Sequence, residues 1–183
     1  MNQTLQVTLA VSIVTAALVV QTLVMGAAIV PFDILLALSF FFWISRDYAS
    51  HPMPRRILSL YLAGIAVQCL HFYEEYLTGF QNRFPMIFGY EWSDHLFVGF
   101  NLVWLAIFTL AALGVMHRVP IASFPVWFFA IAAGLANGIG HPLLSLKEGG
   151  YFPGLITSPL HLIIGILLTR ELLRTDRFKS ATS

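Results

Sequence analysis

Residues 5–45 read LQVTLAVSIVTAALVVQTLVMGAAIVPFDILLALSFFFWIS and contain one charged side chain, that of Asp33. A membrane helix needs about 20 apolar residues to cross about 30 Å of hydrocarbon. The stretch is therefore too long for a single crossing, and Gly26 stands where a turn would divide it. It predicts two membrane helices, over about residues 5–23 and 27–45.

The composition extends this interpretation to the whole chain of 183 residues. Hydrophobic residues make up 58% and charged residues 10%, and the mean hydropathy is +0.79. Because a soluble domain is about 25% charged, these values exclude a soluble globular protein and a disordered chain. A net charge of +1 excludes a nucleic-acid binder. We expect one all-α membrane domain, a polytopic transmembrane helical bundle of about six spans, with a polar tail at 174–183. The spans are placed at about 5–23, 27–45, 57–78, 95–116, 121–140 and 155–173.

The Lys and Arg residues are distributed asymmetrically in this six-span arrangement. Only Arg83 and Lys147 fall on one side. Because basic residues accumulate in cytoplasmic loops, the asymmetry predicts that both termini are cytoplasmic. We expect an integral membrane protein of a bacterial inner membrane. The eight residues on the other side are Arg46, Arg55, Arg56, Arg118, Arg170, Arg174, Arg177 and Lys179.

Polar side chains of separate predicted helices fall at one depth. At 1.5 Å per helical residue, His71, Asn101 and His161 each lie roughly 9 Å inside the non-cytoplasmic boundary. Asp33 falls at a similar level, and His141 stands at the end of the fifth span. A charge in hydrocarbon costs about 2.5–3.5 kcal/mol. These groups should therefore face inward and share a polar pocket in the outer half of the bundle.

The densest polar motif is Leu70-His71-Phe72-Tyr73-Glu74-Glu75. His71 stands three residues before Glu74 and four before Glu75, so all three side chains can point to nearly the same helix face. An imidazole and a carboxylate one turn apart can chelate a metal ion. The same pair can transfer protons, with the carboxylate orienting the imidazole. Both interpretations remain open at this point.

Two further motifs carry polar residues toward the same level. Asn137-Gly138-Ile139-Gly140-His141-Pro142 repeats the four-residue spacing, between Asn137 and His141. The segment from Gly149 to Pro159 is rich in Gly and Pro and leads to His161, which predicts a tightly folded return into the last span.

These motifs together resemble the HXXEE-motif membrane proteins, a family without a settled function. The resemblance rests on His71-x-x-Glu74-Glu75, on Asn137-x-x-x-His141 and on Tyr151-x-Pro153-Gly154, and it covers about residues 57–173. It implies that these polar positions are shared by the family, and it makes the first two spans an N-terminal addition to the family's usual core. A weaker similarity is to the emopamil-binding sterol isomerases, which carry His-x-x-x-Glu on a membrane helix, as at His71 and Glu75.

The candidate site follows from these positions. We expect His71, Glu75, His141 and His161 to be metal ligands, with Glu74 as a proton carrier, so that His71, Glu74 and Glu75 form the catalytic group. Nitrogen and carboxylate ligands suit Zn, Fe or Mn. Further polar residues are expected to orient this group or to bond between helices, with helix capping favoured for Asp94. They are Asn137, Asn101, His95, Asp94 and Asp33.

Other residues have simpler interpretations. Trp43 and Trp92 lie near span boundaries and are expected to be interfacial anchors. Cys69 is the only cysteine, which excludes a disulfide framework, and it is expected to be a small buried hydrophobic residue.

The sequence favours a membrane-embedded metal-dependent enzyme, either a hydrolase or an oxidoreductase, that acts on a lipid-like or small apolar substrate among the membrane lipids. A metal-free acid/base enzyme such as a lipid isomerase is the first alternative. The second is a binding or transport protein with a protonatable pocket. The largely apolar inner part of the bundle disfavours transport, because conduction needs a polar path.

Overall fold

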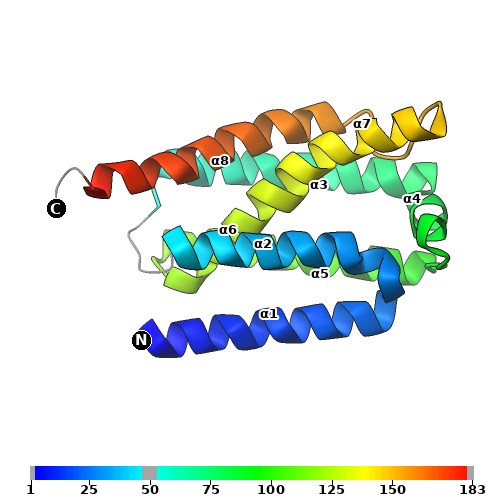
Figure 1. Ribbon diagram of the computed structural model, residues 1–183. Helices are drawn as coiled ribbons and strands as arrows, with labels where there is room; N and C mark the ends of the chain where they lie inside the picture. The colour runs from blue at the N-terminus through cyan, green and yellow to red at the C-terminus, as the bar shows by residue number, and fades with distance from the viewer. Residues whose placement is uncertain (1–2, 47–52, 181–183) are drawn as a thin grey trace.

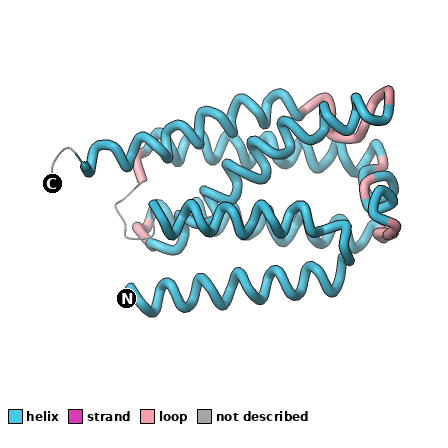
Figure 2. Tube along the Cα trace, in the orientation of Figure 1, coloured by secondary structure: helices cyan, strands magenta, loops and turns pink. Residues whose placement is uncertain are grey.

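The computed structural model describes residues 3–46 and 53–180, which form helices joined by short turns and loops, with no strand in these ranges (Figures 1 and 2). The long helices lie side by side in a bundle, and short helices and loops close one end of it. The elements are α1 (Gln3–Met25), η1 (Gly26–Ile29), α2 (Val30–Arg46), α3 (Arg55–Thr78), α4 (Phe80–Arg83), η2 (Pro85–Phe88), α5 (Asp94–Met116), η3 (Pro120–Ala122), α6 (Ser123–Phe128), η4 (Phe129–Ala136), α7 (Asn137–Glu148) and α8 (Ser158–Ser180).

The first apolar stretch folds back on itself as α1 and α2, which run antiparallel (Figure 1). The turn is at Gly26, whose φ of +69° lies in the left-handed region that favours glycine. A Cβ at this position would meet Cε1 of Tyr90 at 2.1 Å, so the close packing of Tyr90 also requires glycine here. The expected division of residues 5–45 at Gly26 therefore matches the turn in the structure.

Four stretches of the described residues are long and apolar enough to cross a membrane, which marks the chain as a membrane protein. They are Val7–Ser45, Arg55–Thr78, Asp94–Met116 and Pro120–Glu148. The two termini lie at the same end of the bundle (Figure 1). The count of six membrane spans and the cytoplasmic side of the termini stay predictions. Residues 47–52 and the side chains of Arg46, Arg177 and Lys179 lie outside the described residues.

The helix expected over 121–140 is longer in the structure, where it continues through α6, η4 and α7 to Glu148. Its middle part, η4, is a π-helix, and Pro142 is accommodated inside α7. Gly149 ends α7 with a φ of +69°, and Gly150 donates its N–H to the carbonyl of Ser145, the hydrogen bonding of a helix C-cap. The Gly-rich segment thus begins at Gly149, as the sequence suggested, while the helix before it ends eight residues later than expected.

The return helix α8 packs closely on η4 and α7 because glycines face it. A Cβ on Gly134 would lie 2.5 Å from Cα of Gly165, and one on Gly138 would lie 2.6 Å from Cα of Leu162. Small residues at such crossings let two backbones approach closely. This approach brings the start of α8 beside the end of α3.

Three expectations for single residues are wrong. Trp43 is fully buried and donates from Nε1 to Oγ of Ser123 at 2.8 Å, and Trp92 is buried and donates to the carbonyl of Met25 at 2.9 Å. Both rings fill the interior rather than anchor an interface, because their N–H groups find partners there. Cys69 is exposed on the outer face of α3.

Candidate metal centre

Three side chains from two helices meet inside the bundle, close to the end opposite the termini. His71 and Glu75 come from successive turns of α3, and His141 comes from α7. All three are buried, with exposed fractions of 0%, 6% and 4%. The sequence expectation that these three residues gather is therefore realised in the structure.

The ligand-type atoms of the three residues form a compact triangle. Nε2 of His71 lies 3.1 Å from Nε2 of His141, and Oε1 of Glu75 lies 3.5 Å and 3.4 Å from these two nitrogens. A tetrahedral metal with bonds of about 2.0–2.1 Å holds neighbouring ligand atoms about 3.3 Å apart. The triangle therefore has the size that three ligands of one metal ion require, and this buried cluster can hold a metal ion.

The opposite edge of each imidazole ring is already hydrogen-bonded. Nδ1 of His141 lies 2.5 Å from the carbonyl oxygen of Pro153, which can only accept, so this nitrogen carries the ring proton. Nδ1 of His71 lies 2.6 Å from Oγ1 of Thr157, whose own hydrogen is donated to Oε2 of Glu74 at 2.6 Å. Nδ1 of His71 must therefore donate as well. Both Nε2 atoms are left with a lone pair directed into the triangle.

Glu74 holds the loop that covers the triangle. Its carboxylate accepts from Tyr151 Oη at 2.7 Å and from the backbone N–H groups of Ile156 and Thr157, each at 2.8 Å, besides the Thr157 hydroxyl. Burial of the Tyr151 phenol and its bond to Glu74 raise the pKa of Tyr151. The structure thus places Glu74 beside the loop, one hydroxyl away from His71, while its role as a proton carrier stays a prediction.

Gly154 is the point of closest approach between this loop and the triangle. Its φ is +89°, and a Cβ there would lie 2.4 Å from Nδ1 of His141 and 2.8 Å from Cε1 of His71. Both observations require glycine. The positive φ would strain any other residue, and the two imidazoles leave no room for a Cβ. The Pro153-Gly154 pair of the sequence motif therefore sets the positions of both imidazoles.

His161 lies next to the triangle but is not part of it. Its ring packs against that of His71, with centroids 4.6 Å apart, yet its nitrogens are not among the ligand atoms that lie within 4.8 Å of one another. Neither nitrogen makes a hydrogen bond of good geometry within the described residues, and the backbone of Ala133 is the polar group that faces the ring. The expectation of a fourth ligand at His161 does not match this placement.

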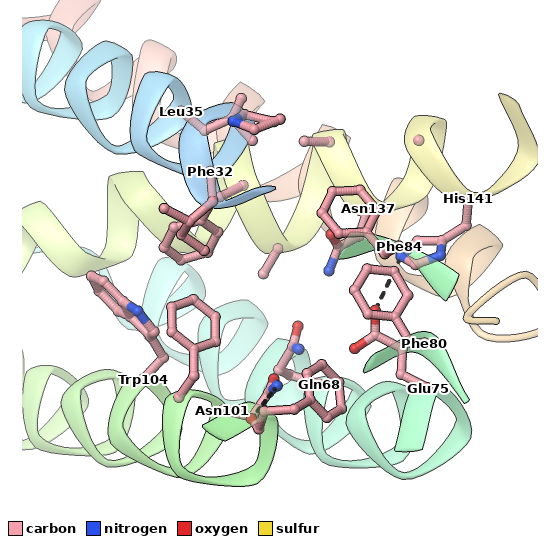
Figure 3. Close-up of a pocket in the computed structure, with 18 of the residues that line it drawn as sticks. Phe32, Leu35, Gln68, Glu75, Phe80, Phe84, Asn101, Trp104, Asn137 and His141 are labelled. Carbon is pink, nitrogen blue, oxygen red and sulfur yellow. Dashed lines mark hydrogen bonds and ion pairs between the residues drawn. The ribbon is translucent and has the colours of Figure 1, made fainter. Parts of the chain in front are cut away.

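A cavity of about 250 Å³ adjoins the triangle and includes Glu75 and His141 in its wall. Figure 3 shows these two residues at one end and Phe32 and Trp104 at the other. Three amide side chains also line it, those of Gln68, Asn101 and Asn137. Two of these amides were expected from sequence near the site. Gln68 was missed, although it stands three residues before His71 and seven before Glu75 and so shares their helix face.

The remaining polar residues of the sequence expectation lie elsewhere. Asp33 accepts from Nε2 of Gln21 at 3.3 Å and Oγ1 of Thr22 at 2.9 Å, which joins α1 to α2. Asp94 accepts from Gln81, while Ser93 supplies the helix cap. His95 is exposed. None of Asp33, Asp94 and His95 touches the triangle, and the expected capping by Asp94 is provided by the residue before it.

Comparison with known proteins adds one finding. No curated protein and no solved structure matches this chain. A family model described as a protein of unknown function with HXXEE motif matches residues 62–168. This range holds all three corners of the triangle and the loop that covers it, and it agrees with the resemblance drawn from His71, Glu74 and Glu75. Since the match spans more than half of its residues, the chain belongs to the HXXEE-motif family.

Proposed function

We propose that this protein is a membrane-embedded, metal-dependent enzyme that acts on a small apolar substrate. The observation that carries the proposal is the pair of Nε2 lone pairs on His71 and His141, 3.1 Å apart and beside the Glu75 carboxylate. Lone pairs at this distance repel each other unless a cation lies between them. A metal ion satisfies all three groups at once.

The donor set indicates the class of chemistry. Two imidazoles and one carboxylate bind zinc in hydrolases, and the same set binds iron in non-haem oxygenases. Such a metal, when bound, supplies Lewis-acid polarisation or activation of a bound water or oxygen. The remaining coordination position would face the cavity, which shares Glu75 and His141 with the triangle.

The chain's own residues prepare this chemistry. The Pro153 carbonyl and the Thr157 hydroxyl fix the tautomers and ring orientations of His141 and His71. Glu74 orients the Thr157 hydroxyl and stays within one hydrogen bond of it, so it can accept a proton passed along this chain. The aromatic wall of the cavity excludes water from the substrate side.

Metal analysis of the purified protein tests the proposal. Wild type should carry about one transition-metal ion per chain, and His71→Ala, His141→Ala and Glu75→Gln should each lose it. His95→Ala is the matched control, because His95 is exposed and lies outside the triangle. Wild type that binds no Zn, Fe or Mn after reconstitution would contradict the proposal.

One observation favours a second candidate, a metal-free acid/base enzyme. The separation of 3.1 Å between the two Nε2 atoms also suits a hydrogen bond with a shared proton. In that case the His71–His141 pair, with Glu75 beside it, would move protons on the substrate. Turnover that persists in chelator-treated wild type and disappears in His141→Ala would establish this candidate instead.

A further inference from the structure

We propose that the cavity beside the triangle binds an uncharged apolar molecule through a hydroxyl group, which the amides of Gln68, Asn101 and Asn137 recognise. The claim that this molecule is the substrate rests on the proposed function, whereas the claim that it binds in the cavity does not.

The wall of the cavity disfavours an anionic ligand. The described residues that line it include no Lys or Arg, and the ionisable ones among them are Glu75 and His141. In the metal-free protein, a carboxylate or phosphate entering this space would lose its hydration and meet the Glu75 carboxylate without a compensating cation. The cavity of the metal-free protein therefore favours a neutral ligand.

The amides nevertheless require a polar group on the ligand. Oε1 of Gln68 is buried and has no hydrogen-bond partner among the described residues. The side chain of Asn137 makes no hydrogen bond to the described part of the chain, and Figure 3 shows its amide directed into the space. An unsatisfied buried polar atom costs about 1–3 kcal/mol, so a ligand that pairs with these amides gains affinity by relieving that cost.

The direction of the hydrogen bond follows from Asn101. Its Nδ2 donates to the carbonyl of Phe97 at 3.1 Å, which fixes the amide with Oδ1 free. A free amide oxygen, like that of Gln68, accepts and needs a donor on the ligand. A hydroxyl donates a hydrogen and can also accept one from Asn137, so an alcohol fits better than a ketone or an ether.

The size and position of the cavity limit the rest of the molecule. A volume of 250 Å³ lies just below the usual range of about 300–1,000 Å³ for small-molecule sites. It suits one compact ring system or a single short chain, and it is too small for a two-chain phospholipid. The lining reaches Pro31, exposed at the start of α2, and Leu144 on α7. Entry would therefore be lateral, from the hydrocarbon between these two helices.

Four naphthalene probes of similar size test the proposal in purified, detergent-solubilised protein. They are 2-naphthol, 2-methoxynaphthalene, naphthalene and 2-naphthoate, and saturable quenching of tryptophan emission reports binding because Trp92 and Trp104 line the cavity. We expect 2-naphthol to bind roughly three- to tenfold tighter than the methoxy and unsubstituted probes. We expect no saturable binding of 2-naphthoate to chelator-treated protein, in which no metal ion can attract the carboxylate.

Variants separate recognition from partitioning into detergent. Asn101→Leu and Asn137→Leu should each reduce the preference for 2-naphthol while naphthalene still binds, and Asn82→Leu, on an exposed residue of α4, should leave it unchanged. Ala136→Phe should fill the cavity and abolish binding of all probes, whereas Ile139→Phe, exposed on the same segment, should not. If an Asn variant fails to fold, the comparison of Ala136→Phe with Ile139→Phe still tests whether the probes bind in the cavity.

Metal content measured on the same samples distinguishes this inference from the proposed function. Probe preference without bound metal would sustain the binding site and overturn the metal enzyme. Metal binding on reconstitution, together with 2-naphthoate binding as tightly as 2-naphthol in chelator-treated protein, would overturn the binding site alone. A preference for 2-naphthol that survives both Asn variants, or binding that survives Ala136→Phe, would equally overturn it.

Discussion

The Nε2 atoms of His71 and His141 lie 3.1 Å apart although each ring already carries a proton on Nδ1. Two neutral imidazoles would ordinarily turn so that a donor meets an acceptor. Here the Pro153 carbonyl and the Thr157 hydroxyl prevent that rotation, since each needs the Nδ1–H as its donor. The fold therefore holds the lone pairs of the two Nε2 atoms close together. Metal binding and thermal stability should both depend on whether a cation lies between them.

Metal should stabilise the folded protein. A ligand that binds only the native state adds about 2.7 kcal/mol at 100 times its Kd, so adding the cognate ion to chelated wild type should raise the thermal midpoint. His141→Ala should show no such rise, because it removes one corner of the triangle. His95→Ala should respond like wild type, and an equal rise in His141→Ala would place the metal elsewhere.

Thr157→Val should weaken metal binding without removing a ligand. The change deletes the hydroxyl that orients His71, and loss of such outer partners typically lowers metal affinity 10- to 100-fold. Competition with a chromophoric chelator measures the change. Thr109→Val, at an exposed position of α5, is the control. Unchanged affinity in Thr157→Val would show that the ring of His71 is positioned by packing alone.

Gly154→Ala should disrupt the metal centre. The new Cβ would collide with both imidazoles and would also strain a backbone with a φ of +89°. We expect loss of bound metal and a lower thermal midpoint. Gly150→Ala in the same loop should be tolerated, because nothing lies within 4 Å of a Cβ at that position. Full metal occupancy in Gly154→Ala would mean that the loop can withdraw from the site.

Gly165→Ala should destabilise the bundle at the crossing of α8 and η4. A Cβ on Gly165 would lie 2.6 Å from backbone atoms of Gly134 and Leu135, and overpacking of this kind costs about 1–3 kcal/mol. Gly99→Ala faces open space on α5 and should instead gain up to about 1 kcal/mol from helix propensity. Thermal unfolding in detergent compares the two, and equal midpoints would contradict the close crossing.

The bond from Tyr151 to Glu74 should fail only at strongly alkaline pH. Because burial and the carboxylate raise the pKa of Tyr151, its stabilising effect is complete below the unfolded value of about 10. The effect disappears as pH rises through the higher folded value. The difference in thermal midpoint between wild type and Tyr151→Phe should stay constant from pH 6 to about 9 and then shrink. A difference that already vanishes near neutral pH would show that another group controls this bond.

Much of this architecture could be predicted from local patterns. Apolar runs located the long helices, Gly26 located the first turn, and the four-residue spacing put His71 and Glu75 on one face. His141 could be brought to the same level by counting residues along its helix. These features depend on the spacing of residues within one helix or on their distance from the end of a helix. Both quantities can be counted directly from the sequence.

The rest depends on how helices rotate and which loop covers them. Trp43 and Trp92 stand near span ends, yet their orientation is set by Ser123 and by the Met25 carbonyl, which no local pattern identifies. His161 packs against the ring of His71, but its nitrogens lie outside the triangle, and this depends on the rotation of α8. The hydrogen-bond partners of Glu74 could not be predicted, because its four donors come from a loop that lies far along the chain.

The hairpin of α1 and α2 supplies part of the cavity wall from outside the range that the family model matches. The three corners of the triangle fall inside residues 62–168, whereas Phe32 and Leu35, which wall the cavity, precede that range. The triangle and the amides of the cavity thus lie inside the matched range, whereas part of the apolar wall lies before it. Exchanging this hairpin for another would change the shape of that apolar wall and leave the triangle and the amides in place, a modular way to vary which hydrocarbon shapes fit.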